Sequence, residues 1–309
     1  MSRRLLLILA APVLLVLGAL GLYARDPAPL DRAAFAALYA DPAPAPEGPR
    51  GVYHLGHSLV GRDMPAMLAQ LAPDGHAYAS QLGWGATLRS HWEPDVPVNG
   101  FEAENAHPAY RDAHEAVGSG EYDAVVLTEM VEIADAIQYH DSPRYLHLWA
   151  DKARAAGATV YLYETWHRRD DPAGWRARLD RDRGLYWEDA VLRAALARSE
   201  TPAPVHVIPG GQVMAALARA LEADGPVEGL ADMGDLFADE IHFNDLGAYL
   251  MALTHYAVLY QRNPEGLPHA LSRADGSPAD DPGPQAAALM QRVVWEVVRA
   301  DPLSGVRDR

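Results

Sequence analysis

Short apolar runs alternate with longer amphipathic stretches along the chain from residue 51 onwards. The short runs predict buried strands, and the stretches with apolar residues every three or four positions predict helices. The predicted strands cover residues 52–55, 76–81, 124–127, 159–163 and 205–208. The predicted helices cover residues 64–71, 143–156, 186–198, 212–223, 246–261 and 285–299. Strands that alternate with helices indicate βαβ units, so we expect a three-layer α/β/α sandwich with a five-stranded, mainly parallel sheet.

The region of residues 89–119 lacks a clear period, although it carries several aromatic residues and histidines. We expect a long ordered loop or a small insertion here. Loops of this kind often line binding sites in domains with a rigid sheet.

The N-terminus has the pattern of an export signal. Ser2-Arg3-Arg4 precedes an uncharged apolar stretch that runs from residue 5 to residue 24. A cleaved signal peptide and a retained membrane anchor are both compatible with it, since twenty apolar residues can also span a bilayer. We therefore expect an exported protein, periplasmic or otherwise extracytoplasmic, whose residues 1–24 form its sole contact with the membrane.

Proline and alanine dominate the following residues 25–50, which predicts an extended linker. A short helix around residues 30–39 could interrupt this linker or pack back on the domain. We expect one large domain over residues 51–300 and a frayed tail over residues 301–309.

Composition excludes several classes of function. The chain has 309 residues, a formal net charge of -16 and no cluster of basic residues, which excludes nucleic acid as a partner. It has no cysteine, so thiol nucleophiles and thiolate metal sites are excluded. The histidines lack the spacing of a metal motif, so we predict no metal and no cofactor.

Two segments carry residues suited to nucleophilic catalysis. Gly56-His57-Ser58-Leu59 follows the first predicted strand, where ligands bind in open parallel sheets. Asp239-Glu240-Ile241-His242 precedes the helix predicted from residue 246. A serine nucleophile needs a base, and that base needs an orienting carboxylate. Because residues three apart on a turn can project to one side, Asp239 and His242 could activate Ser58; the alternative is that they merely cap a helix.

These two segments resemble the first and fifth blocks of the SGNH, or GDSL, hydrolase family. The resemblance implies a flavodoxin-like α/β/α domain that hydrolyses esters without a metal. It also implies that Ser58 is the nucleophile, His242 the general base and Asp239 the residue that orients it. Gly83-Trp84-Gly85 resembles the second block, which gives a glycine amide to the oxyanion hole. Gly85 matches that position better than Gly83, and the amide of Ser58 would be its companion donor.

The chain departs from the family pattern at two points. His57 stands where the name motif has aspartate, and Thr128-Glu129 stands where the third block has an oxyanion-binding asparagine. Thr128 could donate its hydroxyl to the oxyanion, and Glu129 could accept a hydrogen bond from a substrate hydroxyl. Because this pair resembles the Gln-Glu pair of carbohydrate-esterase-like branches, it favours acyl esters of sugars.

Polar residues also follow the fourth predicted strand. Glu164 and His167 belong to the segment Glu164-Thr165-Trp166-His167, which would lie at the same edge of the sheet as Ser58. We predict that both contact the substrate. Ordinary loop packing is an equally good reading of this segment.

The predicted function is that of a serine esterase acting on acyl esters, with acetyl as the favoured acyl group. Its substrate would be a small-molecule ester or a cell-envelope glycan. One alternative is an O-acetyltransferase of envelope polysaccharide, which would use the same three residues. Another is an inactive glycan-binding module, in which the missing asparagine marks a lost active site.

Overall fold

The computed structural model describes residues 26–307. The predicted signal or anchor, residues 1–24, lies outside this part of the chain. Across residues 26–307, no helix is both long and apolar enough to cross a membrane.

A five-stranded parallel sheet forms the centre of the domain. Its strand order is β2-β1-β3-β4-β5, and every neighbouring pair is parallel. The strands are β1 (Gly51–His57), β2 (Ala77–Gly83), β3 (Ala124–Thr128), β4 (Thr159–Glu164) and β5 (His206–Pro209). The predicted fold class is therefore confirmed, and each predicted strand overlaps an observed one. Because all strands run the same way, their carboxyl ends share one edge of the sheet.

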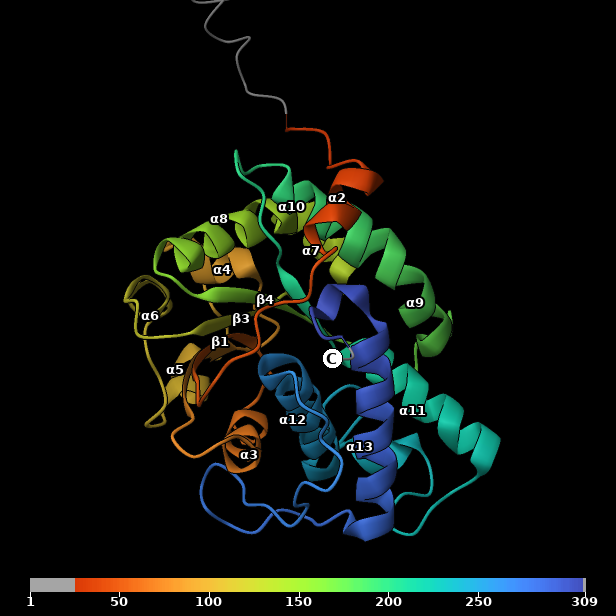
Figure 1. Cartoon of the computed structure of the whole chain (residues 1–309). Coiled ribbons are helices and arrows are strands. Elements are labelled where there is room, and N and C mark those ends of the chain that lie inside the picture. The colour runs from red at the N-terminus through yellow and green to blue at the C-terminus, as the bar shows by residue number, and fades with distance from the viewer. Residues whose placement is uncertain (1–25, 308–309) are drawn as a thin grey trace, which may run out of the picture.

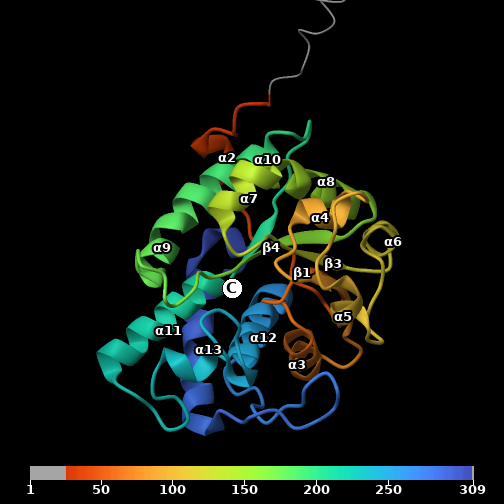
Figure 2. The same ribbon diagram turned by 180° about the vertical axis from the view of Figure 1, so that it is seen from behind.

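Helices cover both faces of the sheet, as Figures 1 and 2 show from opposite sides. Alternate residues of β1 and β3 supply the two cores: Val52 and Val126 pack on one face, and Tyr53 and Val125 on the other. The first face is covered by α3 (Asp63–Leu71), α11 (Gly210–Asp224), α12 (Asp245–Tyr260) and α13 (Gly283–Ala300). The second is covered chiefly by α4 (Leu88–Trp92), α6 (Ala113–Gly118) and α8 (Ser142–Ala155). This arrangement is the three-layer sandwich that the alternating pattern predicts.

One helical region is longer than predicted. The helix expected at residues 186–198 begins at residue 175 and is made of α9 (Trp175–Asp182), a π-helical stretch η1 (Arg183–Leu192) and α10 (Arg193–Leu196). Charged residues dominate its first two turns, which hides the apolar period in the sequence. In addition, a π-helix advances its side chains at a different angle from an α-helix.

Residues 89–119 contain helices rather than one long loop. These are part of α4, then α5 (Phe101–Asn105) and α6, and α7 (Ile133–His140) follows β3. Side-chain caps help to form such short helices: Thr87 and Ser90 make a capping box at α4, and Asp112 caps α6. Two short 3-10 turns complete the fold, η2 (Met233–Leu236) and η3 (Pro302–Ser304).

The segment before β1, interpreted from sequence as a linker, lies against the domain over residues 26–50. It contains α2 (Arg32–Leu38), and Phe35 and Tyr39 are buried. The Tyr39 hydroxyl donates to the carbonyl of Val205 at 2.8 Å. Of the two arrangements that the sequence allowed for this helix, the structure has the one that packs back. Residues 301–307 also pack on the domain, since Val306 is fully buried, so the expected fraying does not occur there.

Candidate active site

Ser58 directly follows β1 at the point where the strand order reverses. β1 lies between β2 and β3, and its register pairs His57 with Gly83 and Leu55 with Leu127. Since the strands are parallel, Ser58 lies between the residues that follow β2 and those that follow β3. Open α/β sheets bind their ligands at this switch point.

A glycine and a histidine at the end of β1 shape the turn that carries the serine. Gly56 has no room for a side chain, because a Cβ there would lie 2.7 Å from the Cβ of Thr128. The buried His57 ring accepts from the amide of Leu59 at 3.2 Å and donates to the carbonyl of Glu129 at 2.8 Å. Burial lowers the pKa of His57 to about 4, so the ring is neutral near pH 7. His57 thus ties the turn after β1 to the end of β3.

The structure brings Ser58, His242 and Asp239 together. The Oγ of Ser58 lies 3.0 Å from Nε2 of His242, and Nδ1 of His242 lies 2.8 Å from Oδ2 of Asp239. In the neutral ring, Nδ1–H then donates to the carboxylate while Nε2 accepts from the serine hydroxyl. The side chains of His242 and Asp239 are 46% and 55% exposed, so a substrate can reach the base from solvent.

Asp239 also organises the loop that carries it. Its Oδ1 accepts from the amides of Ile241 at 2.8 Å and His242 at 2.7 Å. The hydrogen bond from the His242 ring, followed by these two amides, holds the pKa of Asp239 well below its usual range. An ionised carboxylate is therefore available to orient the imidazole and to stabilise it when it becomes charged.

Residues 237–243 form a small closed loop, which we call the Asp-His loop. An antiparallel bridge joins Phe237 to Phe243. The indole nitrogen of Trp166, which follows β4, donates to the carbonyl of Ile241 at 2.9 Å. The buried Trp166 ring packs on Phe237 and Phe243, with centroid distances of 6.2 and 5.9 Å. Trp166 therefore holds the Asp-His loop in place without touching the reacting groups.

Two further contacts fix the two sides of this loop. The amide of Arg169 donates to the carbonyl of Glu240 at 2.9 Å, and their side chains lie 3.3 Å apart. At the other side, the Asn244 side chain caps α12 by accepting from the amides of Leu246 and Gly247. The helix cap is recognisable in the sequence, but we did not predict the supporting roles of Trp166 and Arg169. No local pattern marks them, since their partners lie about seventy residues away along the chain.

The two glycine candidates for the oxyanion hole have different surroundings at the end of β2. Gly83 is the last residue of β2, and a Cβ there would lie 2.2 Å from a methyl carbon of Val98. Its lack of a side chain is thus explained by packing. Gly85 has a φ of 57° in an exposed turn, with open space where a Cβ would be. Packing therefore accounts for Gly83 but not for Gly85, which stays the predicted backbone donor.

The residues in place of the third-block asparagine point into the fold. Thr128 is fully buried, and its hydroxyl faces Gly56 without a hydrogen-bond partner among the described residues. The Glu129 carboxylate is 1% exposed and accepts from the amides of Leu88 and Met130 and from the Ser142 hydroxyl. It therefore joins the starts of α4 and α8. The structure does not bring either side chain to the accessible surface where we expected oxyanion or substrate contacts.

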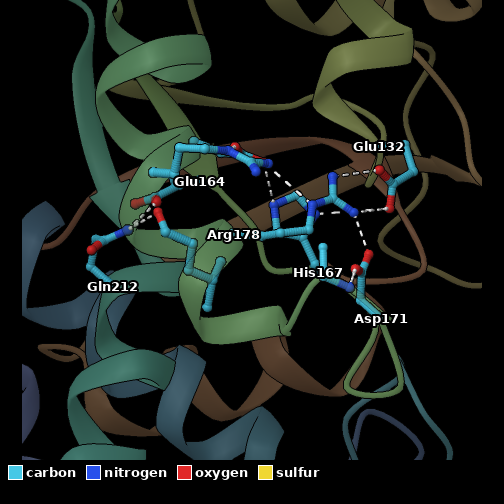
Figure 3. Close-up of polar contacts among 10 residues, drawn as sticks. Glu132, Glu164, His167, Asp171, Arg178 and Gln212 are labelled. Carbon is cyan, nitrogen blue, oxygen red and sulfur yellow. Dashed lines mark hydrogen bonds and ion pairs between the residues drawn. The ribbon is translucent and has the colours of Figure 1, made fainter.

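Glu164 and His167 are likewise buried, in the polar cluster of Figure 3. Glu164 accepts from Gln212 at 2.8 Å and pairs with Arg183 at 3.2 Å. Burial raises the pKa of Glu164 to about 7, although Arg183 and Gln212 act in the opposite direction. The expected contact of Glu164 with substrate is therefore not found, because its carboxylate is used inside the fold.

His167 lies with Arg178 among acidic residues in the same figure. Its Nε2 is 3.0 Å from Asp182, and Arg178 pairs with Glu132 at 2.8 Å and Asp171 at 2.5 Å. These contacts hold the loop after β4 against α9. The side chain of His167 thus supports the loop that carries Trp166 and is not directed to a substrate.

Among residues 26–307, no three His, Asp or Glu side chains gather as a potential metal site. The histidines that follow or lie in β1 have other surroundings: the nitrogens of His57 are both hydrogen-bonded, and His54 is buried beside His255 at a centroid distance of 5.7 Å.

No family model matches the chain, and no curated protein matches it. The crystal structure of a DUF4886 family protein from Bacteroides uniformis ATCC 8492 is similar, with 15% identity over 80% of this chain and 94% of that chain and a TM-score of 0.47. The crystal structure of TesA is also similar, with 17% identity over 67% of this chain and 96% of that chain and a TM-score of 0.34. Both likenesses are distant, so we infer the chemistry of the site from its own geometry.

Proposed function

We propose that this protein is an SGNH-type serine esterase that hydrolyses acyl esters, with Ser58 as nucleophile. The observation that carries the proposal is the continuous hydrogen-bonded line from Ser58 through His242 to Asp239, at 3.0 and 2.8 Å. The proposal includes export directed by residues 1–24 and a carbohydrate as the alcohol of the ester, as the sequence predicts.

In the first half of the reaction, Nε2 of His242 takes the proton of the Ser58 hydroxyl while Oγ attacks the carbonyl carbon of the ester. The carbonyl π bond opens, and its electron pair moves onto oxygen. When this intermediate collapses, the bond to the alcohol breaks, and the alcohol leaves with the proton from His242. The acyl group stays on Ser58 as an ester.

In the second half, His242 takes a proton from water, and the resulting hydroxide attacks the acyl-enzyme. Collapse releases the carboxylic acid and returns the proton to Oγ of Ser58. The amides of Ser58 and Gly85 would hold the oxyanion in both halves, because they lie on adjacent turns at the carboxyl edge of the sheet. Loss of one such donor typically costs about 100- to 1000-fold in rate.

The test is hydrolysis of p-nitrophenyl acetate by the full-length protein in rapid-mixing experiments. We expect a burst of p-nitrophenol equal to the enzyme concentration, or a steady rate if deacylation is fast. Ser58→Ala and His242→Ala should each lower kcat by about 10³-fold or more. A fluorophosphonate should label the wild type at Ser58, with the modified peptide identified by mass spectrometry.

Ser119→Ala is the matched control, since Ser119 is an exposed serine on α6's C-terminal side whose hydroxyl donates to the carbonyl of Ala116 and accepts from the amide of Glu121. It should retain full activity and labelling. A folded wild-type protein with neither turnover nor fluorophosphonate labelling would reject the esterase and leave the glycan-binding module as the better reading.

A further inference from the structure

A small pocket lies beside the turn that carries Gly85. Its walls come from the turn after β2, from residues 96–99 and from Met130, which closely follows β3. His140 of α7 closes one side. Ser58 follows β1 between the ends of β2 and β3, and the pocket residues Trp84 and Met130 closely follow these two strands, so the pocket lies at the same edge of the sheet as the nucleophile.

The walls of this pocket suit an apolar, uncharged group. Trp84, Ala86, Val96 and Met130 supply apolar surface, and the cavity has a volume of about 240 Å³. The hydroxyls of the Thr87–Ser90 capping box are already bonded to each other's backbone. Apart from this capping box, the polar side chains on the lining are Asn99 and His140, so apolar side chains outnumber the polar ones left for a ligand.

The side chain of Trp84 is held in one orientation in this wall. Its indole nitrogen donates to Glu104 at 2.7 Å, and a Cβ on Gly100 would lie only 2.3 Å from the indole ring, so this face of the ring packs on a glycine. The side chain is nevertheless 55% exposed. A large apolar side chain that is fixed on one face and open on the other loses little entropy when a ligand covers it.

The position of His242 decides which part of the ester the pocket receives. His242 enters from the loop before α12, on the face of the sheet covered by α3 and α12. The pocket lies on the opposite side, beside α4. Because the leaving alcohol must receive its proton from His242, the alcohol lies on the α12 side and the acyl group lies on the α4 side.

The volume limits the size of that acyl group. A cavity of roughly 150 Å³ is enough for a benzene ring, and drug-sized ligands need about 300 Å³ or more. A pocket of about 240 Å³ lies between these values. It holds an acyl group of roughly six to ten carbons, which is larger than acetyl and shorter than the chain of a common membrane lipid.

We propose that the pocket lined by Trp84, Val96 and Met130 binds the acyl group and selects medium-length acyl chains. This inference rests on the proposed esterase function and adds the acyl specificity to it. It replaces the acetyl group favoured by the sequence as the best acyl substrate. The carbohydrate expected as alcohol is independent of it.

The test measures kcat/KM for p-nitrophenyl esters from acetyl to palmitoyl. For the wild type, kcat/KM should rise about four-fold for each added CH₂ up to roughly octanoyl and then level or fall. Met130→Trp narrows the pocket and should move the optimum about two to four carbons shorter, whereas Met130→Ala should move it longer. Val96→Ala should also move the optimum to longer acyl chains, and Val96 belongs to a different segment of the wall from Met130.

Ala288→Leu on α13 is the control for a change of apolar volume elsewhere, since Ala288 is exposed, and its acyl profile should match that of the wild type.

A second series of substrates keeps the acetyl group and varies the alcohol of the ester. Unchanged acyl profiles in all three pocket variants would overturn the inference while the esterase stands. A change confined to the alcohol series would assign the pocket to the alcohol and overturn it too. Absence of turnover with every ester would reject the esterase itself.

Discussion

At the scale of single residues, Asp239→Asn separates the orienting role of this carboxylate from its role in the loop. The asparagine oxygen can still accept from the amides of Ile241 and His242, so the loop keeps its shape. Its amide group, however, would donate toward Nδ1 of His242 and favour the tautomer with a proton on Nε2. That tautomer cannot accept the proton of Ser58, so kcat should fall about 10²- to 10⁴-fold in steady-state ester hydrolysis.

Asp170→Asn is the control for the loss of one exposed carboxylate near the site. Asp170 pairs with Arg168 at 2.8 Å and touches neither the Asp-His loop nor Ser58 in this structure, so its kcat should stay near that of the wild type. An equal loss of kcat in both variants would point to general electrostatics, and an unchanged kcat in Asp239→Asn would remove the orienting role.

The three residues that the structure brings together were recognisable in the sequence because each lies in a short local pattern. Asp239 and His242 are three residues apart, and Ser58 directly follows a strand, so motif and periodicity identify them together. Glu164 and Glu129 were also correctly placed at strand ends, yet their side chains turn inward. Their partners, such as Gln212 for Glu164, lie elsewhere along the chain, and strand position alone does not say which way a side chain points.

At the scale of elements, the Asp-His loop depends on the segment after β4, so Trp166→Phe tests positioning. This change removes the 2.9 Å bond to the carbonyl of Ile241 and keeps an aromatic ring beside Phe237 and Phe243. The loop should become less ordered, because a lost hydrogen bond costs about 1 kcal/mol. We expect kcat to fall about ten-fold with little change in KM, since misplaced catalytic groups lose rate before they lose binding.

Trp187→Phe provides the comparison, because Trp187 is equally buried but packs in the opposite core, away from this loop. It should lower the thermal midpoint without a comparable loss of kcat. Equal effects of the two changes on kcat, at matched stability, would contradict a positioning role for Trp166.

Helices and strands were predictable where burial of one face imposes a regular spacing of apolar residues. They were less predictable where polar contacts decide whether a helix forms. All five strands and helices such as α3, α12 and α13 follow apolar patterns of the sequence. α5 and α7 are short and lie at the surface, and they were missed. α9 was missed because its charged residues, among them Arg178, form ion pairs with Glu132 and Asp171 that no periodicity reveals.

At the scale of the whole molecule, the segment before β1 joins the fold more closely than composition suggests. A Pro/Ala-rich stretch reads as a spacer because it cannot form a long helix. Even so, Phe35 and Tyr39 are buried, and the side chain of Gln261 donates to the carbonyls of Ala43 and Pro44 at 3.0 Å. A few apolar residues decide whether such a stretch packs on the domain. The overall composition of the stretch does not show their positions.

The buried cluster of Figure 3 should make the stability of the domain depend on pH through Glu164. Its pKa rises from 4.5 to about 7 on folding, so between these pH values the unfolded chain releases a proton that the folded chain keeps. The free energy of unfolding therefore falls as the pH rises through this window. Glu164→Gln removes the titrating group, while Arg183 keeps its 2.5 Å contact with Asp301. The free energy of unfolding of the variant, relative to that of the wild type, should therefore rise by on the order of 1 to 3 kcal/mol from about pH 4.5 to about pH 8.

Urea unfolding of both proteins at these two pH values measures this difference. Glu222→Gln, which removes an exposed carboxylate paired with Arg176, is the control, and its difference from the wild type should not change with pH. A pH-independent difference for Glu164→Gln as well would mean that Glu164 stays ionised throughout, held by Arg183 against the effect of burial.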